Sequence, residues 1–305
     1  MSEPERRIYE RPPSLVPAWV RAVAAGGKKV PLDLASLQFP RLEHELWPQK
    51  AEPKSVARYR KLCSFVEGPY LPATYPQLMA GALHIHMLTD PAFPLPAAGI
   101  VHMRNVIEQV HPIGVQDPIH FACHLAPARP TDKGVEIDVV TQATVHGQPV
   151  WRSVITALAR APGPHKPVKR DGVAKVDGLL PGHVAIGPSR SVPIRVPEDM
   201  GRKYAALAGD YNPIHLHATT AKLFGFKRAI VHGMWSLGRC IAECEDDLPM
   251  GPVRIDVQFR KPVFLPSLVL FEAMRGEDGV RFGLRSKDGA TLHLAGSALA
   301  MDGPA

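Results

Sequence analysis

Cysteine is scarce in this chain of 305 residues, and its spacing excludes two kinds of stabilised fold. The four cysteines are too few and too far apart for a disulfide framework, which predicts a reducing compartment such as the cytoplasm. Cys240 and Cys244 would share one face of a helix, but no second cysteine or histidine pair at metal-site spacing flanks them. We therefore expect buried thiols, with neither a disulfide-stabilised domain nor a metal site.

The sequence also lacks a long hydrophobic run near its start. The apolar stretch from Val16 to Ala25 is interrupted by Pro17 and Arg21, and the residues that precede it are charged. Signal peptides and membrane-spanning helices both need an unbroken apolar segment. We therefore expect no signal peptide and no membrane span.

Aromatic residues make up only 7% of the chain, although its formal net charge is +7. Surfaces that bind nucleic acid typically combine stacking aromatic side chains with clustered basic residues, and here the basic residues are dispersed. We therefore expect no nucleic acid as a partner. The positive charge favours another anionic partner, either a phosphorylated cofactor or an acidic protein.

The remaining composition is that of a folded protein with about two domains. Hydrophobic residues make up 45% and charged residues 21% of the chain. Residues 1–47 are rich in proline, arginine and glutamate and predict an N-terminal extension, which we set aside from the chemistry. Residues 162–187, rich in proline, glycine and lysine, predict a linker between domains at 48–161 and 188–305.

Two histidine-bearing segments recur on both sides of the predicted linker. Leu83–His86 precedes Gly99–Met103 in the first half, and Ile214–His217 precedes Ala229–Met234 in the second. The matching histidines are 18 residues apart in the first half and 17 apart in the second. This repetition predicts a diverged duplication.

Each half then continues into strand-like segments that end in a hairpin pattern. Val135–Val140 and Val253–Phe259 are rich in β-branched residues, and His146-Gly147 and Asp288-Gly289 supply turn residues before a last strand. The sequence therefore predicts the α+β class, with a central helix wrapped by an antiparallel sheet in each half. Two such copies can pair edge to edge.

A compact motif follows a helix predicted over residues 197–207. It reads Gly209-Asp210-Tyr211-Asn212-Pro213-Ile214-His215. Five fixed residue types at this spacing arise rarely by chance, so the motif is a specific one. It resembles the hallmark Gly-Asp-x-Asn-Pro-x-His of the MaoC-like dehydratases, also called R-specific enoyl-CoA hydratases or the hydratase 2 family.

The resemblance covers most of the chain, because such proteins often carry two hotdog domains of which only the C-terminal one bears the motif. The chain looks most similar to the long bacterial acyl dehydratases of this family. The resemblance implies a double hotdog fold with a degenerate first copy. It also implies R-specific hydration of trans-2-enoyl thioesters, or the reverse dehydration, in fatty-acid metabolism.

The residues of the motif support this chemistry on physical grounds. Pro213 suits the first turn of a helix, so Asp210 before that turn and His215 within it can face one pocket. Hydration of an α,β-unsaturated thioester needs a hydroxide equivalent at Cβ and a proton at Cα, which a base and an acid supply. We expect His215 to be the base and Asp210 the acid of a coupled pair, with Asn212 orienting the pair or the water.

Negative charge builds on the thioester oxygen during this reaction, and a donor must stabilise it. Gly233 lets a thioester approach the backbone, and a helix predicted from Met234 to Glu245 offers free N–H groups at its start. The resemblance implies the same glycine. We expect His232 and Met234, which flank it, to contact the substrate.

The first half lacks the motif. Met79 stands five residues before His84, where the second half has Asp210 five residues before His215. We therefore expect a catalytically silent copy whose histidines, at 84, 86 and 102, are relics or satisfied polar residues. Our hypothesis is that this half widens a tunnel for a long acyl chain.

Coenzyme A or an acyl-carrier protein would explain the positive charge, because both carry phosphate and the carrier protein is acidic. Lys227, Arg228, Arg260 and Lys261 are the residues we expect to bind them. We expect no cofactor beyond the CoA or phosphopantetheine that the substrate carries. The internal pair can exist as a monomer, or an exposed sheet edge can make a homodimer.

Two other functions remain open from the sequence. A hotdog acyl-thioesterase would use a carboxylate on the central helix, where Glu243 and Glu245 lie, but would leave the motif unexplained. A non-catalytic subunit that binds acyl thioesters would have no need of both Asp210 and His215.

Overall fold

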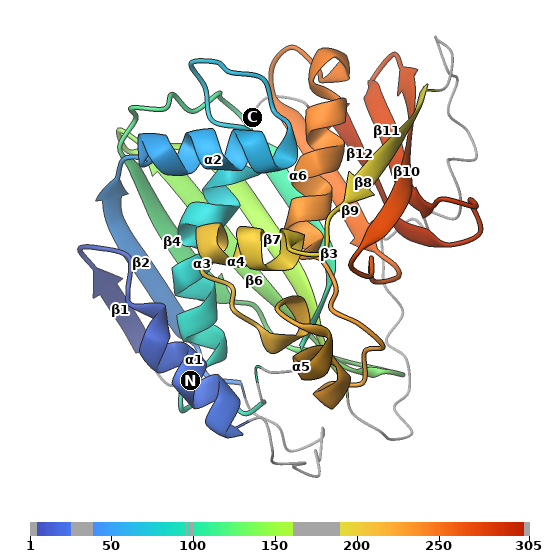
Figure 1. Ribbon diagram of the computed structural model, residues 1–305. Helices are drawn as coiled ribbons and strands as arrows, with labels where there is room; N and C mark the ends of the chain where they lie inside the picture. Colours follow the sequence, from blue (N-terminus) through green and yellow to red (C-terminus); the bar gives the residue numbers. More distant parts are fainter. Residues whose placement is uncertain (1–4, 26–38, 96, 98–99, 161–189, 302–305) are drawn as a thin grey trace.

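The structure, a computed structural model, describes residues 5–25, 39–95, 97, 100–160 and 190–301. The predicted linker, residues 162–187, lies outside the described residues. The chain forms two halves, each with a central helix packed on an antiparallel sheet (Figure 1). This arrangement confirms the predicted α+β class and the double hotdog.

The N-terminal half is built around helix α3 (Tyr75–Leu88), whose Ala80, Leu83 and Met87 are fully buried. This helix packs against β2, β4 and β6. The other elements of this half are β1 (Glu5–Tyr9), α1 (Leu15–Ala25), β2 (Leu42–Gln49), α2 (Pro53–Cys63), β3 (Val101–Gln109), β4 (Ile119–Leu125), β5 (Arg129–Thr131), β6 (Gly134–Val145) and β7 (Gln148–Arg160).

The C-terminal half is built around helix α6 (Gly233–Glu243), which packs against β11 and buries Trp235, Leu237 and Ile241. Helices α4 and α6 correspond to the two helices predicted from the sequence. The other elements are β8 (Arg190–Val196), α4 (Met200–Ala208), η1 (Pro213–His215), α5 (Ala218–Leu223), η2 (Glu245–Asp247), β9 (Val253–Phe259), β10 (Ser267–Gly276), β11 (Gly279–Ser286) and β12 (Leu292–Ala300).

The two halves join edge to edge. Within the described residues, one sheet runs in the order β1-β2-β4-β6-β7-β3-β9-β12-β11-β10-β8, with β5 paired to β6. Strands β3 and β9 pair antiparallel, with Ile107 opposite Ile255. The Arg104 guanidinium crosses this join and donates from Nε to Asp256 Oδ1 at 2.8 Å. The predicted edge-to-edge pairing is therefore confirmed.

The element order repeats in the two halves, but it corrects the predicted pairing of histidines. Helices α3 and α6 correspond, because each precedes the strand, β3 or β9, that forms the join. His84 lies inside α3, whereas His215 lies in η1, ahead of α6. The similar spacing was coincidental. Residues 64–74, between α2 and α3, are the shorter counterpart of residues 209–232, so the N-terminal half lacks the whole motif-bearing segment.

Strand β2 crosses the boundary predicted at residue 47. Its Leu42 and Leu46 are buried in the core, and it pairs antiparallel with β4. The acidic residues that suggested an extension, Glu43 and Glu45, alternate with the buried Leu42, His44 and Leu46, as expected of a half-buried strand. The predicted extension therefore contributes β1, α1 and β2 to the N-terminal half. The other two predicted boundaries lie outside the described residues.

The predictions about cysteines and membrane segments can also be compared with the structure. All four cysteines are free and buried, and burial raises the pKa of the Cys63 and Cys123 thiols to about 12. Over the described ranges, no helix has both the length and the apolar character needed to cross a membrane.

Truncating a buried side chain at the centre of the join between β3 and β9 should lower the free energy of unfolding. Ile255→Ala removes a fully buried side chain from β9 and should destabilise the protein by about 2–5 kcal/mol. Met250→Ala, at an exposed position before the same strand, should change stability by less than about 0.5 kcal/mol. Urea denaturation followed by circular dichroism measures both, and equal midpoints for the two variants would contradict the assigned role of the join.

Candidate active site

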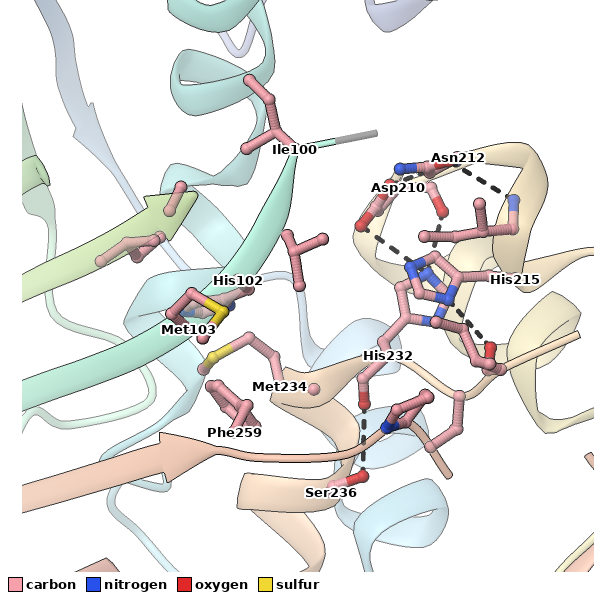
Figure 2. A pocket seen from close by; sticks show the side chains of 18 of the residues that line it. Ile100, His102, Met103, Asp210, Asn212, His215, His232, Met234, Ser236 and Phe259 are labelled. Carbon is pink, nitrogen blue, oxygen red and sulfur yellow. Dashed lines mark hydrogen bonds and ion pairs between the residues drawn. The ribbon is translucent and has the colours of Figure 1, made fainter. Parts of the chain in front are cut away.

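A cavity of about 760 Å³ lies between the two halves. Helix α3 contributes one face to its wall, with lining residues at the helical spacing of Leu78, Gly81, Ile85 and Leu88. In Figure 2 the side chains of β3 and β9 face those of the motif-bearing segment across this space. Of the residues singled out from the sequence, the cavity is lined by Asp210, Asn212, His215, His232, Gly233, Met234, Arg260 and Lys261.

The motif forms a tight turn whose residue types have local reasons. Gly209 ends α4 with a φ of +72°, a conformation that favours glycine. Asp210 Oδ1 accepts a hydrogen bond from the Asn212 N–H at 3.2 Å, and Asn212 Oδ1 caps η1 by accepting from Ile214 N–H at 3.4 Å. Pro213 occupies the first position of η1, as predicted. This turn presents the Asp210 and His215 side chains to the same cavity.

The proton on the His215 ring is fixed by a backbone partner. Its Nδ1 lies 2.9 Å from the carbonyl oxygen of Ile230, and because a carbonyl only accepts, Nδ1 carries the hydrogen. Burial, followed by the neighbouring His232, lowers the pKa of His215 to about 3. The ring is therefore neutral at physiological pH, and its Nε2 holds a lone pair.

His232 packs directly on His215 and links it to Asp210. The two imidazole rings stack with centroids 3.7 Å apart. His232 Nε2 donates to the Asp210 carbonyl oxygen at 3.0 Å and lies 3.8 Å from Asp210 Oδ2. Burial lowers the pKa of His232, so this ring is also neutral. The ring of Tyr204, on α4, lies against it with centroids 5.0 Å apart.

Gly233 begins α6 beside these histidines. The helix has no side-chain cap at its start, so N–H groups of its first turn are available to a ligand. A Cβ at position 233 would lie 3.1 Å from Cε1 of Phe259, so a side chain there would require the phenyl ring to shift by a few tenths of an ångström. The next residue, Met234, accepts a hydrogen bond at Sδ from Asn105 Nδ2 of β3 at 3.3 Å. The N-terminal half thus helps to position this side of the cavity.

The structure separates the four basic residues that the sequence singled out. Arg260 and Lys261 follow β9 and line the cavity. Lys227 and Arg228 are exposed and lie outside its lining, and the Arg228 guanidinium stands over the ring of Phe264 at 5.7 Å. Two of the four residues are therefore placed to meet a ligand.

The histidines of the first half have different surroundings from one another. His84 also lines the cavity, but both of its ring nitrogens hydrogen bond to neighbours, Gln77 and Thr141, which agrees with the expectation of a satisfied polar residue. His102 lines the cavity, its Nε2 donates to the Arg104 carbonyl oxygen at 3.0 Å, and burial lowers its pKa to about 4. Sequence reasoning did not predict that this ring faces the site.

Several other lining residues, including Tyr204, Phe259 and Trp19, also escaped the sequence analysis. No local motif marks them. Tyr204 lies on α4 just before the motif, whereas Phe259 and Trp19 reach the cavity from distant parts of the chain.

Asp210, His215 and His232 also lie close enough together to hold a metal ion. One donor atom from each lies within 4.8 Å of the others. Carboxylate and imidazole groups are ordinary ligands of transition metals. The backbone hydrogen bonds described above already account for the cluster, and the expectation of a reaction without a metal stays a prediction.

Comparison with known proteins fits this geometry. Residues 183–295 match the family described as MaoC like domain. The chain is 31% identical over 252 residues to the 3-hydroxyacyl-thioester dehydratase X of Mycobacterium tuberculosis, across 80% of this chain and 84% of that protein. The chain belongs to the MaoC-like dehydratase family.

Solved structures of the family share the fold. The crystal structure of HtdX from Mycobacterium tuberculosis superposes with a TM-score of 0.72 at 28% identity, covering 85% of this chain and all of that one. A MaoC-like dehydratase from Phytophthora capsici has a TM-score of 0.68 at 18% identity, covering 89% of this chain and all of that one. The double hotdog is therefore the family fold.

The buried histidines predict a loss of stability in mild acid. Burial lowers the pKa of His84 to about 3 and that of His44 to about 4, alongside His102 and His215. Below about pH 6.5 these histidines bind protons in the unfolded chain but remain neutral in the folded chain. The free energy of unfolding therefore falls as the pH drops toward 4. The melting temperature should be lower at pH 5.0 than at pH 7.5.

His84→Gln serves as the matched variant for this measurement. Glutamine keeps polar groups near Gln77 and Thr141 but does not titrate, so the variant should lose less stability than the wild type between the two pH values. A wild-type melting temperature that is equal or higher at pH 5.0 would contradict the neutral state of these histidines.

Proposed function

We propose that this protein adds water to trans-2-enoyl thioesters to give R-3-hydroxyacyl thioesters, and that it catalyses the reverse dehydration. The observation that carries the proposal is the neutral His215 ring, with a lone pair at Nε2, beside the Asp210 carboxylate in one cavity. The name of the Mycobacterium tuberculosis relative, a 3-hydroxyacyl-thioester dehydratase, supports the same reaction. The R configuration is implied by the family resemblance.

His215 takes a proton from water as the water oxygen bonds to Cβ of the enoyl thioester. The electron pair of the double bond moves into an enolate. His215 passes the proton taken from water to the Asp210 carboxylate, which delivers it to Cα. The pair is then again a neutral imidazole and a carboxylate, so one water is consumed and no other reactant is needed. The two groups act as one titrating unit.

The enolate oxygen requires a donor, and the start of α6 supports this role. Gly233 is the first residue of α6 and lines the cavity, as do His215 and His232. Its N–H and the positive end of the helix dipole are the donors that this proposal assigns to the enolate oxygen. Because Gly233 has no Cβ, a flat thioester can approach the backbone there. Asn212, which caps η1 through its side chain, orients the Asp210 turn.

The acyl chain extends along α3 in this proposal. The apolar face formed by Leu78, Ile85 and Leu88 supports a long hydrocarbon chain rather than a short one. The thioester end is carried by CoA or by the phosphopantetheine of an acyl-carrier protein, near Arg260 and Lys261. His232 and Met234 contact the thioester region. The proposal includes no metal and no separate cofactor, and the chain acts as a monomer or a homodimer.

A thioesterase is a weaker candidate. The two glutamates that could serve it, Glu243 and Glu245, do not line the cavity. Glu243 pairs with Arg239 on the same helix, and Glu245 accepts a hydrogen bond from the Val66 N–H at 3.0 Å. Both therefore have structural partners. A purely binding role leaves the Asp210 and His215 pair without a purpose.

Removal of either member of the catalytic pair should abolish most turnover. Asp210→Asn and His215→Gln should each lower kcat by about 10²–10⁴-fold, because each removes one partner of the acid–base pair. The loss of enoyl-thioester absorbance on hydration measures the rate. Thr219→Ala, at an exposed position of α5, is the control and should keep wild-type activity. Folded variants with wild-type rates would contradict the mechanism.

The two classes of basic residue predict different kinetics. Lys261→Ala should raise KM for an enoyl-CoA several-fold with little change in kcat, because it removes a charge at the cavity. Added salt should shrink the difference. Lys227→Ala, outside the cavity lining, should leave KM unchanged. Equal effects of the two substitutions would refute the assignment of Lys261 to the thioester carrier.

A further inference from the structure

Helix α1 reaches the active site from the N-terminal segment that the sequence analysis set aside. The Trp19 indole N–H donates to the carbonyl oxygen of Gly209 at 2.9 Å. Leu15, one turn earlier on the same face, packs so closely that a Cβ at Gly209 would lie 2.2 Å from its Cδ1. Because Gly209 directly precedes Asp210, α1 contacts the chain one residue before the proposed acid.

The Trp19 side chain is also part of the cavity wall. It lines the same cavity as Leu88 at the end of α3, Thr89 directly after it, and Ala208 at the end of α4. The ring is half-buried, and tryptophan offers a large rigid apolar surface with one hydrogen-bond donor. A single side chain can therefore limit the cavity and hold the backbone of the motif.

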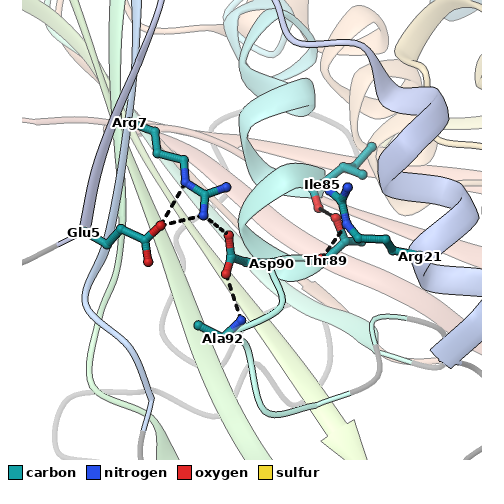
Figure 3. A network of polar contacts seen from close by, with 7 residues as sticks. All are labelled: Glu5, Arg7, Arg21, Ile85, Thr89, Asp90 and Ala92. Atoms are coloured by element: carbon teal, nitrogen blue, oxygen red, sulfur yellow. Dashed lines mark hydrogen bonds and ion pairs between the residues drawn. The ribbon is translucent and has the colours of Figure 1, made fainter.

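Polar contacts fix this N-terminal segment to the end of α3 (Figure 3). Arg21 Nε, on α1, donates to the Thr89 carbonyl oxygen at 3.1 Å. Arg7, on β1, forms an ion pair with Asp90 at 2.7 Å, and the Asp90 side chain is only 2% exposed. Strand β1 itself pairs in parallel with β2. These contacts hold α1, and with it Trp19, against the rest of the site.

We propose that Trp19 is a positioning and specificity-determining residue of the hydratase reaction. Its N–H fixes the Gly209 carbonyl and so the orientation of the Asp210 carboxylate, and its ring limits the space for the acyl chain. The inference rests on the proposed function and deepens it. It makes the N-terminal segment a part of the active site.

Two substitutions at the same position separate the two roles. Trp19→Phe keeps an aromatic wall and removes the donor, so kcat should fall about three- to tenfold while the order of preference among acyl lengths stays the same. Trp19→Ala removes both, so kcat should fall and the ratio of kcat/KM for long over short enoyl-CoA chains should also rise several-fold. Val20→Ala, exposed on the same helix, is the control and should change neither.

The ratio of kcat/KM for long over short enoyl-CoA chains tests the specificity role directly. A general loss of stability lowers activity on all chain lengths and does not raise this ratio. Wild-type kcat in Trp19→Phe together with the wild-type length profile in Trp19→Ala would overturn the proposal. Thermal melting of all three variants verifies that they remain folded.

Binding separates this proposal from the proposed function. If the wild type turns over no enoyl thioester, the proposed function fails. The position of Trp19 in the cavity is then tested independently of turnover, by titrating tryptophan fluorescence with a long-chain 3-hydroxyacyl-CoA. Quenching in the wild type that is lost in Trp19→Phe supports the position of the ring in the ligand cavity. Equal quenching in both proteins overturns it.

Discussion

The antiparallel pairing of β3 with β9 is the interaction on which the rest of the structure depends. It joins two small sheets into one and thereby covers one edge of each, which would otherwise be exposed. It also sets α3 and α6 beside a shared cavity, to which both halves contribute walls. The ion pairs that Arg104 and Arg254 make with Asp256 and Glu108 cross the same join and match its register.

The two halves of the chain contribute different kinds of residue to the cavity. The reacting groups come from residues 209–232, whose counterpart in the first half is too short to hold the motif. The first half instead supplies an apolar helix face, and Asn105, which orients Met234. Burial keeps both histidines of the cluster neutral, whereas the Asp210 side chain is 39% exposed. One low-dielectric site thus holds a base and a carboxylate in different surroundings.

The sequence predicted the parts of this arrangement that are local. The turn from Gly209 to His215 is encoded by adjacent residues, so its shape and its chemistry could be deduced together. The pairing of His84 with His215 was wrong, because similar spacing in a sequence does not require equivalent positions in a fold. Trp19 could not be predicted, because its contact with Gly209 spans 190 residues of chain. Only the packing of α1 against α3 and against the turn after α4 brings them together.

The central claim is that the Asp210 and His215 pair adds water to a thioester held at the start of α6. A crystal structure of the Asp210→Asn variant with a long-chain R-3-hydroxyacyl-CoA tests it most directly. The account predicts that the 3-hydroxyl lies between residue 210 and His215 Nε2, that the thioester oxygen accepts from the Gly233 N–H, and that the acyl chain follows α3. A ligand whose 3-hydroxyl lies away from both residues of the pair would contradict it.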